Sequence, residues 1–260
     1  MNQLARSSDA ELTSRARNAL LWSGAITLAL YLIPYGNYVA YPLLLLSTLV
    51  HELGHGIAAV ISGGEFVRFV MHADGSGVAM TRSDPGGMTR AFIMAGGLCG
   101  PAVGAAFCFL MARRASWARY TLGAFGFLLI LAEILVVRNG FGVGFVAVVA
   151  ALCLVVAFFA SESLTQMTLV FLAVQLALSV FSRADYLFVE GGYAGGQLMP
   201  SDTKQMEMVL GLPYWFWGGL CALFSLLVLA AGAYYFLRGA QRAKIARATR
   251  RATKLTNAAK

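Results

Sequence analysis

Residues 43–61 read LLLLSTLVHELGHGIAAVI, an apolar stretch of membrane-spanning length that carries three ionisable side chains: His51, Glu52 and His55. In a helix the two histidines lie one turn apart on the same face, so both imidazoles can reach a single metal ion. Glu52 directly follows the first histidine, and in HExxH motifs this carboxylate serves as general base for water at the metal. Ionisable groups are costly inside hydrocarbon, so they are usually found there only where they have a function. The stretch therefore predicts a catalytic metal site inside a membrane helix.

The composition of the whole chain indicates a membrane protein. Of its 260 residues, 59% are hydrophobic and 12% are charged, whereas about a quarter of the residues in a soluble domain are charged. The first apolar segment is short and ends at Pro34. We therefore expect an all-α polytopic, multi-pass membrane protein with six or seven transmembrane helices. The apolar segments are residues 19–33, 39–62, 89–112, 120–137, 141–160, 164–187 and 208–237.

A small β-hairpin is predicted directly after the motif helix. Residues 65–72 are enriched in β-branched and aromatic side chains, residues 74–77 (DGSG) have turn chemistry, and residues 78–81 form the returning strand. Open strand edges are not tolerated in lipid, so the hairpin must lie at the interface or against helices. An edge strand beside the metal site could pair with an extended substrate by strand addition. A plain connecting loop is the alternative.

Charge divides the chain into three parts. Residues 238–260 carry eight Lys or Arg residues and no acidic residue, and the other 12 basic residues balance the 12 acidic ones, so this segment supplies the net charge of +8. We expect an N-terminal tail at 1–18, a membrane-embedded metallopeptidase domain at 19–237 and a basic cytoplasmic tail at 238–260. Anionic lipids are the expected partner of the basic tail. No nucleic-acid-binding module accompanies it, so nucleic acid is not an expected partner.

A third metal ligand is needed, because catalytic zinc normally takes three protein ligands and leaves one position for water. The four cysteines lie in apolar segments without a CxxC pair, which argues against thiolate ligands. The second, fourth and sixth apolar segments run in the same direction, so an acidic residue late in the fourth or sixth could lie at the depth of the motif. Depth favours Asp185, with Glu133 as a reserve candidate. Asp202 has the pattern of a helix N-cap on the same face of the membrane as Asp185, and it is a second reserve candidate.

The motifs resemble the site-2 protease family of intramembrane zinc metalloproteases, and most closely its branch of small bacterial membrane peptidases. The resemblance covers roughly residues 39–237, and HELGH is its most specific part. The other segments that carry it are HADGSG at 72–77, GGLCGP at 96–101, VRNGFG at 137–142, SRADYL at 182–187, and Ser201-Asp202 leading to GLP at 211–213.

The resemblance implies a Zn²⁺ ion held by His51, His55 and a distal aspartate, with Glu52 activating water. It implies cleavage of a membrane protein or peptide within the lipid bilayer, with a location in the bacterial inner membrane. In the family the distal aspartate normally belongs to an Asp-Gly pair on a later helix, whereas here Asp185 is followed by tyrosine. His72 and Asn139 are candidates to contact the substrate or to support the metal ligands.

The sequence is also compatible with two other classes of protein. A catalytically inactive relative would act as a binding or scaffold protein for other membrane proteins. A metal transporter would also place acidic residues in membrane helices. However, no internal repeat is visible, which disfavours the usual transporter plan.

Overall fold

The computed structural model describes residues 36–83, 86–182 and 184–258, together with isolated positions before residue 36. Within this part of the chain, six helices are long and apolar enough to cross a membrane. This confirms the expected all-α polytopic class. The predicted segment 19–33 lies largely outside the described residues. The six helices are α2 (Gly36–Ile61), α3 (Gly87–Met111), α4 (Ala115–Leu135), α5 (Gly140–Phe159), α6 (Glu162–Ser182) and α8 (Tyr214–Ala258).

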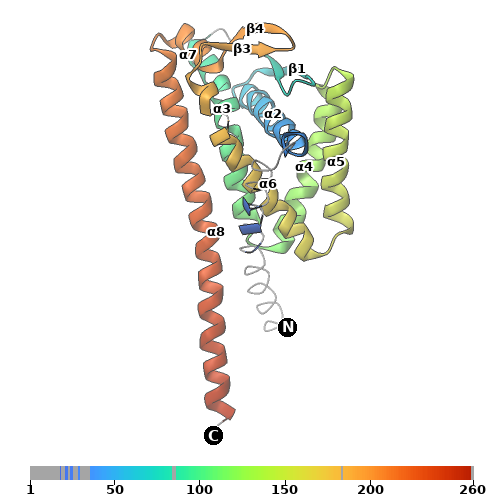
Figure 1. Cartoon of the computed structure of the whole chain (residues 1–260), viewed down its shortest axis with the longest axis vertical. Helices are drawn as coiled ribbons and strands as arrows, with labels where there is room; N and C mark the ends of the chain where they lie inside the picture. The colour runs from blue at the N-terminus through green and yellow to red at the C-terminus, as the bar shows by residue number, and fades with distance from the viewer. Residues whose placement is uncertain are drawn as a thin grey trace.

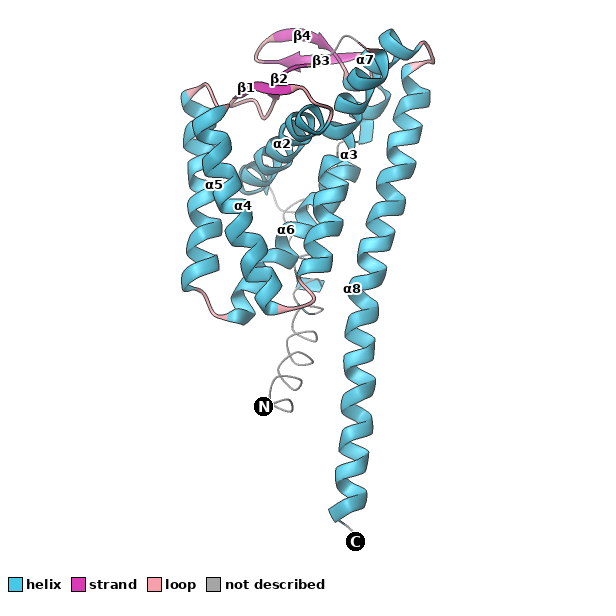
Figure 2. Ribbon diagram, turned by 180° about the vertical axis from the view of Figure 1, so that it is seen from behind, coloured by secondary structure: helices cyan, strands magenta, loops and turns pink. Residues whose placement is uncertain are grey.

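The motif helix α2 crosses the middle of the bundle obliquely (Figure 1). Helices α4 and α5 form a pair on one side of it, and α3, α6 and α8 lie on the other (Figure 2). One end of the bundle carries the β-strands and the short helix α7 (Asp202–Leu210). The opposite end carries the α3–α4 and α5–α6 connections and the C-terminus.

Two β-hairpins cover the end of the bundle. The predicted hairpin is confirmed: β1 (Glu65–Met71) pairs antiparallel with β2 (Gly77–Arg82). A second hairpin, which the sequence analysis did not predict, pairs β3 (Gly191–Ala194) with β4 (Gln197–Pro200). Its two-residue turn, Gly195-Gly196, has positive φ at both positions (57° and 80°), the conformation that glycine favours in tight hairpins. Each strand is only four residues long, too short for a clear alternating pattern.

The last predicted segment, 208–237, is two helices. Helix α7 ends at Leu210, and Gly211 follows with a left-handed φ of 87° that closes the helix. Pro213 then precedes the start of α8 at Tyr214. A short 3₁₀ helix, η1 (Ala184–Phe188), joins α6 to β3. The chain thereby returns to α2, where Asp202, the first residue of α7, lies beside His51 and His55.

Glycines allow α2 and α3 to pack with their backbones in close contact. A Cβ atom added to Gly54 would lie 2.3 Å from the carbonyl oxygen of Gly96, and one added to Gly96 would lie 2.5 Å from Cβ of Ala58. Small residues at a helix interface allow this approach in membranes. The contact fixes the motif helix against α3.

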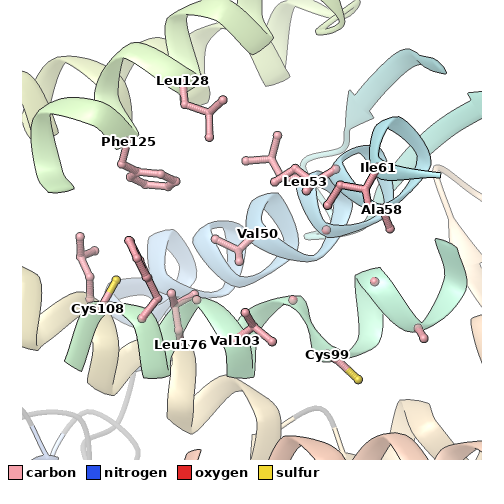
Figure 3. A pocket seen from close by; sticks show the side chains of 18 of the residues that line it. Val50, Leu53, Ala58, Ile61, Cys99, Val103, Cys108, Phe125, Leu128 and Leu176 are labelled. Carbon is pink, nitrogen blue, oxygen red and sulfur yellow. The ribbon is translucent and has the colours of Figure 1, made fainter. Parts of the chain in front are cut away.

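Two cavities lie on opposite faces of α2. The larger, about 1100 Å³, is lined almost wholly by apolar side chains, among them Val50, Leu53 and Phe125 (Figure 3). The smaller, about 410 Å³, is lined by His51 and Glu52 and extends to the two hairpins. The smaller cavity holds the histidines and carboxylates, and α2 separates it from the apolar one.

Candidate metal centre

Three side-chain atoms from α2 and α7 converge at one point. His51 Nε2 lies 3.1 Å from Asp202 Oδ2, and His55 Nε2 lies 3.4 Å from the same oxygen. The two Nε2 atoms are 3.1 Å apart. Among the described residues, these three form the one group whose nitrogen, sulfur or carboxylate atoms are close enough to share a metal ion.

The tautomer of His55 shows that this point is suited to a cation. His55 Nδ1 lies 2.8 Å from the carbonyl oxygen of Ile93 in α3, which can only accept a hydrogen bond. Nδ1 therefore carries the proton of the neutral ring, and Nε2 presents a lone pair towards Asp202. Metal-binding histidines commonly donate their second ring N–H to a backbone carbonyl in this way.

Asp202 supplies an acceptor without a donor. Its Oδ2 atom is buried and has no hydrogen-bond partner among the described residues, although both imidazoles lie within ion-pair distance. An acceptor left in this state is costly, and a cation at the centre of the group would satisfy it. The two nitrogens and one carboxylate oxygen therefore fit a divalent metal ion.

The charge of Asp202 is also that of a metal ligand. Burial alone would raise the pKa of the Asp202 carboxyl, but in the metal-free centre the positive charge that His55 and His51 carry when protonated holds that pKa well below its usual range. The carboxyl is consequently ionised at neutral pH, which is the form that binds a metal.

The start of α7 fixes the position of Asp202. Ser201 is the N-cap: its Oγ accepts a hydrogen bond from the backbone N–H of Lys204 and donates one to the carbonyl oxygen of Val189. Ser201 and Thr203 are fully buried on either side of Asp202. Asp202 is thus the first helical residue rather than the cap, and its carboxylate is free to face the histidines.

Helix α3 fixes the position of His55. A Cβ atom added to Gly97 would lie 2.2 Å from His55 Nε2, so the imidazole rests directly on the α3 backbone. Together with the bond to Ile93, this contact holds the ring from two sides. Tyr186 of η1 lies against His51, with ring centroids 6.1 Å apart in an edge-to-face arrangement.

Glu52 lies beside the three candidate ligands. Its side chain is buried and lines the same cavity as His51, His55 and Asp202. The backbone of β2 is in contact with it: a Cβ atom added to Gly77 would lie 2.8 Å from Glu52 Cγ and 3.0 Å from Glu52 Oε1. The arrangement places a carboxylate between the metal site and the first residue of a strand.

The other predicted site residues do not belong to this three-residue group, or their side chains lie outside the described residues. Asp185 falls in η1, but its side chain lies outside the described residues. Glu133 is half-buried in α4 and does not belong to the three-residue group. His72 lies in the turn of the first hairpin, next to Gly195 of the second. The Asn139 amide forms two hydrogen bonds with the backbone of Met71.

Comparison with known proteins gives one match. A family model described as Peptidase M50B-like matches residues 21–232, which is most of the chain. No curated protein and no solved structure matches the chain.

Proposed function

This chain belongs to the Peptidase M50B-like family, and from that premise we propose that it is a membrane-embedded zinc metalloprotease. The observation that carries the proposal is the convergence of His51, His55 and Asp202 beside Glu52 in one cavity. Asp202 is the proposed third ligand in preference to Asp185, because its described carboxylate oxygen faces both imidazoles.

Each residue has a distinct role in the proposed mechanism. His51, His55 and Asp202 would hold the metal, and the bond from His55 to Ile93 would keep the imidazole lone pair aimed at it. A bound zinc ion supplies Lewis acidity that activates water near neutral pH. Glu52 accepts the proton of the attacking water and later delivers a proton to the leaving amine. The burial of Glu52 limits its exchange of protons with bulk solvent.

The backbone of the first hairpin indicates how a substrate binds. The outer edge of β1 is occupied: Phe69 N donates to Val136 O (2.7 Å) and Phe69 O accepts from Arg138 N (3.0 Å). The Asn139 side chain likewise bonds to both backbone groups of Met71, at 2.6 and 3.1 Å. Phe69 and Met71 therefore direct their backbone groups away from β2.

The inner strand consequently presents a free edge. Phe69 is opposite Ala79, and Met71 is opposite Gly77. Directly opposed residues of an antiparallel pair either both bond across the ladder or both point outward. Gly77 and Ala79 therefore direct N–H and C=O groups away from β1, and in the described part of the chain β2 pairs with β1 alone.

The free edge of β2 lies next to Glu52, the proposed general base. Gly77 is in contact with Glu52, and residues 77–81 line the cavity that holds the metal centre. An extended peptide that pairs with β2 would pass its backbone carbonyls in front of Glu52. We therefore propose that the substrate is an unfolded segment of a membrane protein or a peptide, bound by strand addition.

A proline at position 79 tests the strand-addition model. Ala79→Pro removes an N–H that points away from β1, so the hairpin should persist while pairing with the peptide is lost. We expect kcat/KM to fall roughly tenfold, since a net hydrogen bond is worth about 0.5–1.5 kcal/mol and the ring also excludes the strand. Ala79→Val is the matched control, because it enlarges the side chain and keeps the N–H. Equal kinetics for the two variants would contradict the model.

Metal removal tests the proposed activity itself. The purified protein in proteoliposomes should cleave members of a fluorescence-quenched library of unstructured peptides. Treatment with ortho-phenanthroline should stop cleavage, and added Zn²⁺ should restore it, because three ligands remain to rebind the ion. The non-chelating meta isomer is the control. Cleavage that persists in a preparation depleted of metal would exclude the zinc mechanism.

The chain is an integral multi-pass membrane protein, and we propose the bacterial inner membrane as its location. The α3–α4 connection, which contains Arg113 and Arg114, lies at the same end of the molecule as the C-terminus (Figure 1). This arrangement suits a cytoplasmic C-terminal tail. Contact of residues 238–260 with anionic lipids stays a prediction, because the side chains beyond Arg238 lie outside the described part of the structure.

A further inference from the structure

The second hairpin covers the cavity that holds the metal centre. Gly192, Tyr193 and Ala194 of β3 and the last two residues of β4 line this cavity, together with His51, Glu52 and Asp202. The hairpin lies beyond the first hairpin, at the end of the bundle (Figure 2). Among the described residues, the hairpin therefore forms part of the cavity wall at this end of the bundle.

The hairpin has little buried surface of its own. All four residues of β4 are exposed, and Tyr193 and Leu198 keep 74% and 70% of their surface accessible. An isolated two-stranded hairpin is at best marginally stable. Its closed position therefore depends on contacts at its two ends.

The contact at the tip is small and polar. The backbone N–H of Gly195 donates to Ser76 Oγ in the turn of the first hairpin (3.2 Å). Ser76 Oγ in turn donates to Asp74 Oδ1 (2.5 Å), which orients its lone pairs towards Gly195. Gly195 also lies against the His72 imidazole, where an added Cβ atom would come within 2.6 Å of the ring. These contacts join the two hairpin turns above the cavity.

The contact at the base consists of two hydrogen bonds of one buried serine. Ser201 N donates to Glu190 O (3.0 Å), and Ser201 Oγ donates to Val189 O (2.6 Å). Ser201 is fully buried and immediately precedes Asp202. Neither bond involves the tip of the hairpin, so the residue before Asp202 is anchored at the base.

We propose that the β3–β4 hairpin is a lid over the cavity, hinged at its base and latched at its tip by the Ser76–Gly195 hydrogen bond. Opening the latch widens access to the free edge of β2 without disturbing Asp202. The glycine pair Gly191-Gly192 at the start of β3 gives the hinge its backbone freedom. This proposal rests on the proposed peptidase function, because the lid would admit an extended peptide and then close over it.

A cysteine reporter inside the cavity tests the lid without any assay of cleavage. Met94 lines the cavity from α3 and has no proposed role in binding or catalysis. The rate at which a water-soluble maleimide modifies Met94→Cys is measured in the purified, zinc-loaded protein. Fragment-ion mass spectrometry localises the label to position 94, because Cys99 and Cys108 lie on the same tryptic peptide, residues 91–113.

Variants of the latch should change this rate in a set order. Ser76→Ala should raise it roughly three- to tenfold, the range expected for the loss of one hydrogen bond. Ser76→Thr keeps the hydroxyl and should stay near the parent rate. Gly195→Ala should raise it at least about tenfold, because the new methyl group meets His72 and φ is 57° there. Ser163→Ala, at the far end of α6, is the control for an unrelated serine.

The outcomes separate the lid from the peptidase function. Faster labelling of position 94 in both Ser76→Ala and Gly195→Ala, with zinc content unchanged, supports the lid even if no peptide is cleaved. Unchanged labelling in both variants overturns it, even if the protein is an active peptidase. Faster labelling accompanied by loss of zinc would also overturn it, because the base would then not hold Asp202 independently of the tip.

Discussion

Replacing Glu52 by glutamine should abolish peptide cleavage while the protein keeps its metal. The amide is close in size to the carboxylate, so the contacts with Gly77 persist, but it cannot accept the proton of the attacking water. Loss of a general base lowers rates by about 10²–10⁴-fold. Cleavage of the quenched peptide library and zinc stoichiometry, measured on the same preparation, check both parts of this expectation.

The matched control for this variant is Glu162→Gln. Glu162 is exposed at the start of α6, at the opposite end of the bundle from the hairpins, so its replacement should leave both readouts unchanged. A Glu52→Gln protein that cleaves as fast as the parent would remove Glu52 from the mechanism. If the parent protein is itself inactive and binds as much zinc as the Glu52→Gln variant, a relative that acts as a scaffold is favoured instead.

The second large effect is expected at Asp202. Asp202→Asn should release the metal, because the amide removes the negative charge that two neutral imidazoles cannot replace. We expect zinc affinity to fall by more than about 100-fold, which is the upper range for losing a group that merely supports a ligand. Competition with a fluorescent zinc chelator measures this affinity.

Two further variants make the assignment of the third ligand decisive. Asp185→Asn and Glu133→Gln alter the other acidic residues that the sequence offered, and both should retain metal. Loss of zinc in Asp185→Asn together with its retention in Asp202→Asn would transfer the ligand role to Asp185. Retention in all three variants would mean that the two histidines do not share a metal with any of these carboxylates.

Much of this fold could be predicted from local sequence signals. The apolar segments gave the membrane helices, because hydrophobic length is what a bilayer selects. The spacing of His51 and His55 placed the two candidate ligands on one face, because the helical repeat alone determines this. The turn at 74–77 located the first hairpin, which the structure confirms.

The position of Asp202 beside the two histidines could not be predicted in the same way. If the segments were straight rods, an acidic residue late in a membrane helix would lie at the depth of the histidines. Asp202 instead begins a short helix outside the spans, and it reaches the histidines through the fold of η1, β3 and β4. Its only local signal was the serine-aspartate start of a helix, which is common in proteins without metals.

The role of Asn139 also depends on contacts between segments far apart in sequence. Its two bonds to Met71 close the outer edge of β1 and leave β2 as the strand facing the cavity. The short strands of the lid gave no periodic signal. Such features depend on tertiary pairing that no single segment encodes.

X-ray absorption at the zinc edge of the purified, active protein tests the central claim most directly. The account predicts one zinc per chain, with two imidazole nitrogens at about 2.0–2.1 Å and oxygen ligands at about 2.0–2.2 Å. The Asp202→Asn protein should lose this signal. A shell containing sulfur at about 2.3 Å, or a shell without imidazole, would contradict it.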